Sequence, residues 1–398
     1  MIVADRFHLT YCSNIHAGES WSDVRAALGT ALPRVREQLG VTGPFAVGLR
    51  LSAEAAATLS GAAAQAEFAA FLRDGRYYLL TINGFPYGAF HGMRVKERVY
   101  LPDWRTAARL EYTNRLATLL AALAGDGLGI ERSVSTVPGA FRSEVRGEAD
   151  AAAIADNMLR HAAHLIAIRQ STGTYVSLAV EPEPACFIET IADAEAFFGR
   201  YLFEAGRVAA IARETGVPMT VDAVRSHVGL CFDACHMAVE FEDASAAFDR
   251  LRGAGIRVGK VQISSALQCD DCEPESIARA LRPFADDTYL HQVVERADGQ
   301  LTRYVDLPDA LAAVEAGHGP RDWRIHFHVP IFLRDLGTLR TSQPYLEEVL
   351  RLLIANGDCP FLEVETYTWD VLPPEHRTTD VWTAIARELA WVRTQLTA

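Results

Sequence analysis

The sequence predicts an α/β protein, a (β/α)8 barrel with a hairpin and a strand inserted between its seventh and eighth strands. Short β-rich runs alternate with longer runs of helical period that are rich in Ala, Leu and Arg. This alternation is typical of parallel strands joined by right-handed crossovers. Most of the short runs are almost continuously apolar, as expected of strands that are covered on both faces. Because no glycine-rich phosphate-binding motif follows them, an open nucleotide-binding sheet is disfavoured.

Eight apolar runs account for the barrel strands. The fourth run stops at Pro138-Gly139. Proline has no N–H group to donate to a sheet, so this pair is expected to end the strand. The expected strands are residues 7–11, 45–51, 77–82, 133–137, 176–180, 229–233, 258–263 and 361–365.

Runs of helical period between these strands predict the helices. Ser20 or Ser22 is expected to cap the first helix, and Asp150 is expected to cap the helix over residues 151–171. These side chains accept hydrogen bonds from the free N–H groups of a helix's first turn. Ser60-Gly61 is expected to break the second helix. The expected helices are residues 21–39, 53–73, 106–123, 151–171, 192–215, 244–254, 307–316, 345–355 and 379–396.

The pattern changes after the seventh strand. Two β-rich runs flank an Asp298-Gly299 pair, which predicts a β-hairpin. A later extended run carries His326 and His328. The hairpin strands are residues 289–296 and 301–305, and the later run is residues 324–331. The chain contains no internal repeat, low-complexity segment or linker, so we expect one domain spanning residues 1–398.

Composition narrows the classes of partner. The chain has 398 residues and a formal net charge of −13, which argues against binding to nucleic acid. The first residues lack the basic start and apolar run of a signal peptide. No stretch approaches the roughly 20 apolar residues of a membrane-spanning helix, so we expect no membrane insertion. These observations predict a cytoplasmic protein.

The seven cysteines are an odd number and are scattered along the chain, which suits reduced thiols. Cys269 and Cys272 form a single C-x-x-C pair, whereas a structural zinc site would need a second pair. Asp270 and Asp271, which lie between the two cysteines, would raise the pKa of a nearby thiol rather than lower it. We therefore expect this pair to be a coincidence of spacing.

Polar side chains end four neighbouring strands of the expected barrel. Glu181 follows the fifth strand, Asp233 ends the sixth, Gln262 lies late in the seventh and Glu365 ends the eighth. Functional groups of such a barrel gather at the C-terminal strand ends, and a buried carboxylate needs a partner. Oxygen ligands suit Mg²⁺ or Mn²⁺, and an added imidazole shifts the preference towards Mn²⁺, Co²⁺, Fe²⁺ or Zn²⁺. The sequence therefore predicts that these four residues bind one divalent cation.

Three histidines lie near these strand ends. His236 follows the sixth strand and is expected to bind the metal or hold the substrate, unless it only caps backbone. His326 and His328 share a face if their run is extended. His328 is nearer the end of the run, so it is the better candidate for a metal ligand. The alternative for His328 is a buried ring bonded to backbone.

Two further carboxylates accompany the site. Glu363 shares a face with Glu365, and we assign the ligand role to Glu365 because it is nearer the strand end. Glu183 lies beyond the fifth strand and either supports the site or forms a salt bridge in the loop.

The long segment after the third strand holds candidates for substrate binding. Phe85 and Tyr87 could form an apolar wall, and Lys96 could reach a phosphate, carboxylate or hydroxyl group. His91 lies between them in the chain, and Asn14 follows the first strand. A loop of aromatic residues that packs on itself is an equally good interpretation.

The order Glu, Asp-x-x-His, Gln and Glu over strands five to eight resembles the xylose isomerase-like barrel superfamily. The resemblance implies that Glu181, Asp233, Gln262 and Glu365 match its metal ligands and that His236 matches its histidine. One branch, endonuclease IV, also has a D-x-H motif. Here that motif reads His-Phe-His at residues 326–328, so the aspartate is missing.

A closer resemblance covers nearly the whole chain. Four segments are similar to the EboE family of metabolite traffic proteins, which is linked to clusters that make or export secondary metabolites. These segments are residues 9–16 (LTYCSNIH), 81–88 (TINGFPYG), 135–139 (STVPG) and 362–369 (LEVETYTW). The resemblance implies a cytoplasmic protein that works with others of the same pathway.

The leading hypothesis is a divalent-metal-dependent isomerase or epimerase that acts on a sugar, polyol or cyclitol-like molecule. Glu181 and Glu365 would exchange a substrate proton, and His236 would orient a substrate oxygen. A non-catalytic carrier or scaffold would need the pocket but no acid/base pair. Metal-dependent hydrolysis of a phosphoester is the third hypothesis.

Overall fold

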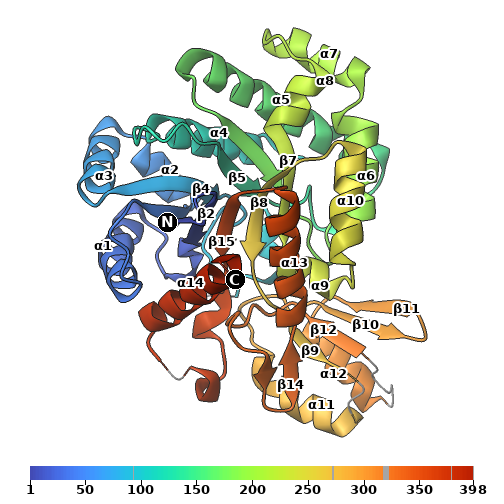
Figure 1. Cartoon of the computed structure of the whole chain (residues 1–398). Helices are drawn as coiled ribbons and strands as arrows, with labels where there is room; N and C mark the ends of the chain where they lie inside the picture. Colours follow the sequence, from blue (N-terminus) through green and yellow to red (C-terminus); the bar gives the residue numbers. More distant parts are fainter. Residues whose placement is uncertain (93, 271–272, 317–321, 378, 398) are drawn as a thin grey trace.

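The computed structural model describes residues 1–398 apart from residues 93, 271–272, 317–321, 378 and 398, and its main sheet has nine strands (Figure 1). Each of the eight expected barrel strands is present, with bounds within one residue of the prediction. The strands are β1 (Ile2–Val3), β2 (Phe7–Tyr11), β3 (Phe45–Arg50), β4 (Tyr77–Asn83), β5 (Arg132–Thr136), β6 (Val176–Val180), β7 (Val228–Asp233), β8 (Val258–Ile263) and β15 (Phe361–Val364).

These strands form a barrel. Their order is β1-β2-β15-β8-β7-β6-β5-β4-β3, and all neighbours from β2 round to β3 are parallel. An isolated parallel bridge between Cys12 and Gly48 joins β2 to β3 and closes the ring. The short strand β1 adds to β2 in the antiparallel sense. The C-terminal ends of the parallel strands therefore meet at one mouth, as the prediction of a (β/α)8 barrel requires.

Helices surround this barrel (Figure 1). Ser20 caps the first one with a capping box to Asp23, and Ser60-Gly61 separates the second from the third, as predicted. The helices are α1 (Trp21–Gln38), α2 (Ala53–Leu59), α3 (Ala62–Asp74), α4 (Ala107–Ala122), α5 (Glu148–Thr172), α6 (Ile191–Phe197), α7 (Ala205–Thr215), α8 (Val221–His227), α9 (Ala234–Val239), α10 (Ala244–Ala254), α13 (Gln343–Asn356) and α14 (Val381–Thr397).

Two helix predictions are wrong in detail. Helix α5 begins at Glu148, two residues before Asp150, whose carboxylate instead accepts a 2.7 Å hydrogen bond from the Arg146 N–H. The expected helix over residues 192–215 is divided into α6 and α7. The Glu204 side chain accepts hydrogen bonds from the N–H groups of Gly206 and Arg207, which starts a new helix there. The unbroken apolar spacing of this segment conceals the break.

The segment between β8 and β15 builds a second sheet, which lies below the barrel in Figure 1. The prediction had three strands here, whereas this antiparallel sheet has six, in the order β11-β10-β12-β9-β14-β13. The strands of this sheet are β9 (Leu267–Cys269), β10 (Val293–Ala297), β11 (Gln300–Tyr304), β12 (Asp322–Ile325), β13 (Asp335–Leu336) and β14 (Leu339–Thr341). The same segment contains the helices α11 (Pro274–Leu281) and α12 (Leu307–Glu315). The strand predicted over residues 324–331 ends at Ile325, so His326 and His328 lie beyond it.

An apolar core fills the space between the barrel and its outer helices. Phe232 of β7 stacks on Phe248 of α10 with ring centroids 4.6 Å apart. Among the described residues, no helix is long and apolar enough to cross a membrane. Five cysteines are free and buried: Cys12, Cys186, Cys231, Cys235 and Cys359. Cys269 is disulfide-bonded, so the prediction that its thiol is reduced is wrong, and Cys272 lies outside the described residues.

Glu388 of α14 makes stability depend on pH. Burial raises its pKa from 4.5 to about 7, although the Thr366 hydroxyl and the Ile331 N–H both donate to its Oε1. A carboxyl whose pKa is raised on folding stabilises the protein below its unfolded pKa and loses that contribution as pH rises through its folded pKa. We expect Glu388 to contribute about 3 kcal/mol less at pH 8 than at pH 4. Urea unfolding of wild type and Glu388→Gln at both pH values measures this difference. The prediction would be contradicted if the free energy of unfolding changed by the same amount between pH 4 and pH 8 in both proteins.

Candidate metal centre

Three carboxylates meet at the mouth of the barrel. Glu181 follows β6, Asp233 ends β7 and Glu365 follows β15, and β7 and β15 both flank β8. One oxygen of each carboxylate lies within 4.8 Å of one oxygen of the other two. All three side chains are buried. Three acids this close in a buried place resemble the ligand set of a cation more than a structural ion-pair network.

The hydrogen bonds of these carboxylates leave two oxygens without a partner. Asp233 Oδ1 accepts from the His236 N–H at 2.9 Å and from the Ser264 hydroxyl at 2.8 Å. Glu365 Oε1 accepts from the amides of Asn14 and Asn83, both at 2.8 Å. Glu181 Oε2 and Asp233 Oδ2 are buried and have no hydrogen-bond partner among the described residues. The donor set therefore fits a divalent cation, which would satisfy both oxygens.

Burial and mutual repulsion change the acidity of this group. Desolvation, followed by repulsion from Glu365 and Asp233, holds the pKa of Glu181 well above its usual range. Desolvation and then Asp233 raise the pKa of Glu365 to about 8. Glu181 and Glu365 therefore keep their protons to higher pH than exposed carboxyls do, and binding of a cation must release those protons. We therefore infer that cation affinity at this group rises with pH.

Gln262 joins the floor of the site from β8. It lies in register between Asp233 of β7 and Glu363 of β15, and it is fully buried. Neither atom of its amide has a hydrogen-bond partner among the described residues. Lys260, two residues earlier, pairs with Glu363 at 2.5 Å. The ligand role of Gln262 remains a prediction, and Glu363 is held below the site by Lys260.

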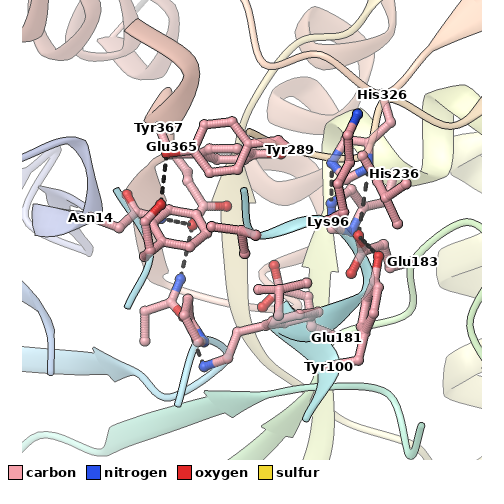
Figure 2. A pocket seen from close by; sticks show the side chains of 17 residues that line it. Asn14, Lys96, Tyr100, Glu181, Glu183, His236, Tyr289, His326, Glu365 and Tyr367 are labelled. Carbon is pink, nitrogen blue, oxygen red and sulfur yellow. Dashed lines mark hydrogen bonds and ion pairs between the residues drawn. The ribbon is translucent and has the colours of Figure 1, made fainter. Parts of the chain in front are cut away.

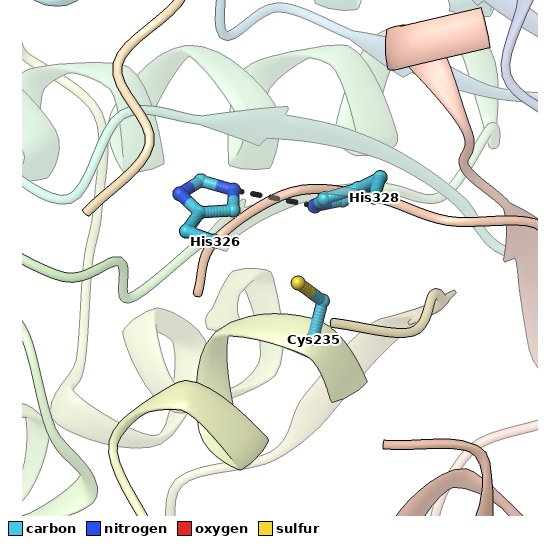
Figure 3. Close-up of side chains that lie close together, drawn as sticks. All are labelled: Cys235, His326 and His328. Atoms are coloured by element: carbon cyan, nitrogen blue, oxygen red, sulfur yellow. Dashed lines mark hydrogen bonds between the residues drawn. The ribbon is translucent and has the colours of Figure 1, made fainter. Parts of the chain in front are cut away.

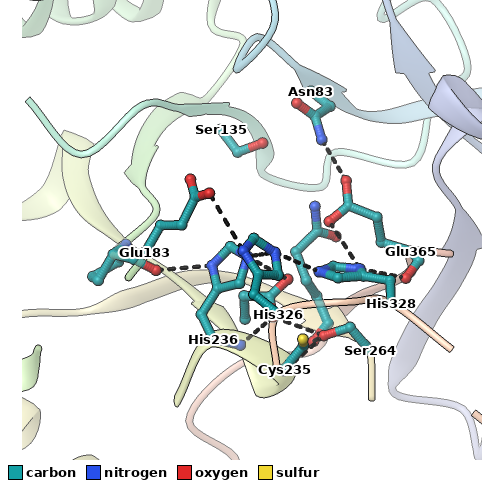
Figure 4. Close-up of polar contacts among 12 residues, drawn as sticks. Asn83, Ser135, Glu183, Cys235, His236, Ser264, His326, His328 and Glu365 are labelled. Carbon is teal, nitrogen blue, oxygen red and sulfur yellow. Dashed lines mark hydrogen bonds and ion pairs between the residues drawn. The ribbon is translucent and has the colours of Figure 1, made fainter. Parts of the chain in front are cut away.

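A cluster of three histidines adjoins the carboxylates (Figure 4), and two of them, His326 and His328, lie beside Cys235 (Figure 3). His236 Nε2 lies 3.1 Å from His326 Nε2, which lies 3.3 Å from His328 Nε2. Glu183 flanks the cluster, with its Oε1 3.6 Å from His326 Nδ1, and Cys235 lies beside His326 and His328. Burial, then the neighbouring rings, lowers the pKa of His326 well below its usual value. Burial also lowers the pKa of His328 to about 4.

This arrangement bears on the roles predicted for the histidines. The ligand atoms of His328 group with Asp233 and His236, and also with Cys235 and His326. His236 lines the pocket and its Nε2 faces His326 Nε2, so its role in orienting a substrate oxygen stays a prediction. Of the two histidines in the His-Phe-His segment the sequence favoured only His328, whereas the structure brings both into the cluster.

A pocket with about 520 Å³ of empty space opens above the carboxylates and the histidines (Figure 2). Tyr289 and Tyr367 pack edge to face on one side of it, with ring centroids 5.1 Å apart. Phe85 also lines the pocket, so it has apolar walls over a polar floor. This mixture suits a small molecule with hydroxyl groups and one apolar face.

The residues predicted to bind substrate are placed differently from one another. Asn14 and Phe85 line the pocket. Lys96 also lines it, but its ammonium group donates to Asp306 Oδ2 at 2.6 Å and to the Asp286 carbonyl at 3.0 Å. His91 lies against Phe90 and is not among the described residues that line the pocket. Substrate binding by these four residues remains a prediction.

Three further residues contact the site, and only Asn83 carries a signal in the sequence. Asn83 ends the apolar strand β4, which is the same pattern that marked Glu181. Tyr100 donates a 2.8 Å hydrogen bond to Glu183 from a segment with no periodicity. Gln292 reaches the same carboxylate from the second sheet, a position that sequence spacing does not reveal.

Comparison with known proteins supports the fold. No protein-family model and no curated protein matches the sequence. A xylose isomerase-like TIM-barrel protein from Mycobacterium smegmatis, solved in complex with magnesium, is 14% identical with a TM-score of 0.53, and the match covers 100% of this chain and 99% of that chain.

Two further solved structures match at lower similarity. A xylose isomerase domain protein from Alicyclobacillus acidocaldarius is 13% identical, and the IOLI protein with a binding zinc atom is 12% identical. Each match covers 98% of both chains at a TM-score of 0.41, too low to add to the fold assignment. From its strand order and from the Mycobacterium neighbour, the chain has the fold of the xylose isomerase-like TIM-barrel proteins.

Proposed function

We propose that this protein is a divalent-metal-dependent isomerase or epimerase acting on a sugar, polyol or cyclitol-like molecule. The observation that carries the proposal is the convergence of Glu181, Asp233 and Glu365 beneath a pocket with aromatic walls, with two buried oxygens that have no hydrogen-bond partner in the described part of the chain. The Mycobacterium neighbour was solved in complex with magnesium, which agrees with a divalent cation in this protein.

The residues of the pocket suit movement of a proton at a carbon that carries oxygen. A bound divalent cation polarises neighbouring substrate oxygens and acidifies the C–H bond beside them. Glu181 lines the pocket and, with Oε2 on the cation, would accept that proton through its other carboxylate oxygen. Glu365 is held by Asn14 and Asn83 and can return a proton from its own side. Tyr289 and Tyr367 would cover the apolar face of the substrate and exclude water.

Pairing of Lys96 weighs against hydrolysis of a phosphoester. Lys96 is the lysine expected to reach a phosphate, and Asp306 already neutralises it. A carrier would gain nothing from carboxyls that repel one another beside its cargo. We therefore favour catalysis over both alternatives.

We further propose that the chain is a member of the EboE family. The four segments that resemble this family support the assignment, and three of them contribute to the site through Asn14, Asn83 and Glu365. The implied role lies in biosynthesis or transport of a secondary metabolite in the cytoplasm, alongside other proteins of that pathway.

Deuterium exchange tests the proposed reaction. Wild-type protein with Mn²⁺, incubated in D₂O with D-fructose, D-xylulose or an inosose, should place deuterium on the carbon beside the carbonyl. Glu181→Gln should slow exchange by about 100-fold or more, because the amide keeps the shape but cannot accept a proton. NMR measures the exchange, and metal content is measured on the same samples.

The control is Glu54→Gln, an exposed residue of α2 that is not among the residues lining the pocket, which should exchange at the wild-type rate. Tight binding of one of these compounds without exchange by the wild type would favour the carrier. Exchange by Glu181→Gln at the wild-type rate would remove Glu181 from the proton transfer.

A further inference from the structure

Three neighbouring strands of the second sheet carry a row of polar side chains. Arg340 of β14 lies opposite Gln268 of β9, and Gln268 lies opposite Arg324 of β12. Residues directly opposite one another in an antiparallel sheet have their side chains on the same face. Because neighbouring strands are about 4.8 Å apart, the backbones of Arg324 and Arg340 are about 10 Å apart, with Gln268 between them.

A pocket with about 860 Å³ of empty space opens over this row. Arg334 lines it together with Arg324 and Arg340. Asp335 is the one acidic side chain among the described residues that line it. The pocket therefore concentrates positive charge in a chain whose formal net charge is −13.

Two of the three arginines have no ion pair to neutralise them. Arg340 lies 3.5 Å from Asp270 Oδ2, which also accepts from the Gln268 amide. Neither Arg324 nor Arg334 forms an ion pair with any described residue. The pocket therefore has a positive charge that its own carboxylates do not balance.

Arg324 is held in place without a counter-charge. Its guanidinium donates to the Ala238 carbonyl and lies over the Phe241 ring, 4.1 Å from the centroid. Its Nε is buried and has no hydrogen-bond partner among the described residues. Burial, followed by the charge of Arg296, lowers the pKa of Arg324 to about 10. A cation in this position is costly until an anion joins it.

Helix α13 begins at the same pocket, where Pro344 and Tyr345 of its first turn line the wall. The Ser342 hydroxyl does not cap this helix and instead accepts a 2.8 Å hydrogen bond from the Ala266 N–H. The Tyr345 hydroxyl is buried without a partner in the described part of the chain. Burial, then Glu242, raises the pKa of this phenol, so it keeps its proton and can donate it. A helix N-terminus also attracts negative charge.

We propose that this pocket binds a phosphate group, either free or carried by a small molecule. A phosphate has a charge of about −1.5 to −2 at pH 7, which matches the two arginines that lack an ion pair. Its tetrahedral oxygens can accept from arginine forks on different sides, whereas a carboxylate offers two oxygens in one plane.

The phosphate site is separate from the metal centre. None of the residues that line it also lines the pocket at the barrel mouth. The assignment comes from the arginines of the second sheet, so it does not rest on the proposed function.

Isothermal titration calorimetry of the full-length protein tests the site without any variant. The probes are inorganic phosphate, glycerol 3-phosphate and acetate, at equal ionic strength in a zwitterionic buffer. We expect one phosphate per chain, bound about 10-fold or more tighter than acetate. Tighter binding of glycerol 3-phosphate would identify a phosphate ester as the ligand, and equal binding would identify the free phosphate group. No phosphate binding, or acetate binding as tight as that of phosphate, would overturn the proposal.

Substitution then identifies the arginines. Arg334→Gln should weaken phosphate binding by about 10-fold or more, since hydrogen bonds to charged groups are strong. Arg334→Lys keeps the charge but loses the planar fork, so it should weaken binding less. Arg340→Gln should also weaken binding, which covers the case in which one variant does not fold. The matched control is Arg282→Gln, which removes an exposed arginine that lies outside the pocket, pairs with Glu315 at 2.6 Å and should bind as the wild type does.

Metal-free protein separates this proposal from the proposed function. Protein freed of metal by chelation and dialysis should bind phosphate as tightly as before, and so should Glu181→Gln. Failure of the proposed reaction would then leave the phosphate site standing. Wild-type phosphate affinity in both Arg334→Gln and Arg340→Gln would refute the phosphate site while leaving the carboxylates at the barrel mouth untouched.

Discussion

Replacing Gly48 with alanine is expected to destabilise the protein by at least about 3 kcal/mol. Gly48 lies where β3 meets β2, and a Cβ atom there would overlap Glu363 Oε1 and lie 2.5 Å from the carbonyl oxygen of Tyr11. The carbonyl belongs to the backbone of β2 and cannot move without disturbing the barrel. Moving Glu363 instead would separate it from Lys260. Urea unfolding of Gly48→Ala against wild type measures the loss.

Gly253→Ala is the matched control for this prediction. Gly253 lies inside α10, and no described atom beyond its chain neighbours and the adjoining helix backbone lies within 4 Å of the Cβ that alanine would add. Alanine is the better helix former, so this variant should be more stable than wild type by roughly 0.5–1 kcal/mol. Equal stability of Gly48→Ala and wild type would mean that β2 and β3 do not approach as closely as the structure has them.

Lys260→Met is expected to cost about 3–5 kcal/mol at pH 7, because it leaves Glu363 buried without its cation. Lys260 and Glu363 are both essentially unexposed and are paired at 2.5 Å, and Lys260 Nζ also donates to the Ser135 hydroxyl. Burial alone lowers the pKa of Lys260, but the attraction of Glu363 outweighs it and raises the pKa above its usual value. The ammonium group is therefore charged in the fold.

The double variant Lys260→Met with Glu363→Leu provides the control. Removing both charges together should recover most of the stability lost in the single variant, because an apolar pair needs no compensation. Losses that simply add in the double variant would show that the two residues act independently and that the pair does not hold the barrel floor.

The sequence predicts the barrel and the positions of its acidic residues because both depend on local patterns. An apolar run that ends in a carboxylate, as at Glu181, Asp233 and Glu365, gives a strand and a residue at its C-terminal end. The barrel then brings the strand ends together. Their role as ligands is still a prediction, but their proximity follows from the topology.

The rest depends on contacts between distant segments, which leave no local signal. The expected run over residues 324–331 stops at Ile325, where β12 ends and the chain turns towards the barrel mouth. His326 therefore meets His236 and Gln292. The pairing of Lys260 with Glu363 is hidden likewise, because each residue interrupts an otherwise apolar strand in a different part of the sequence.

Diffraction from crystals grown with Mn²⁺, recorded at the manganese absorption edge, tests the central claim that the carboxylates at the barrel mouth bind a divalent cation. We predict an anomalous peak about 2.0–2.6 Å from oxygens of Glu181, Asp233 and Glu365. The peak should vanish in Asp233→Asn crystals grown under the same conditions. No peak at these oxygens in the wild type, or a peak bound only by other residues, would contradict the claim.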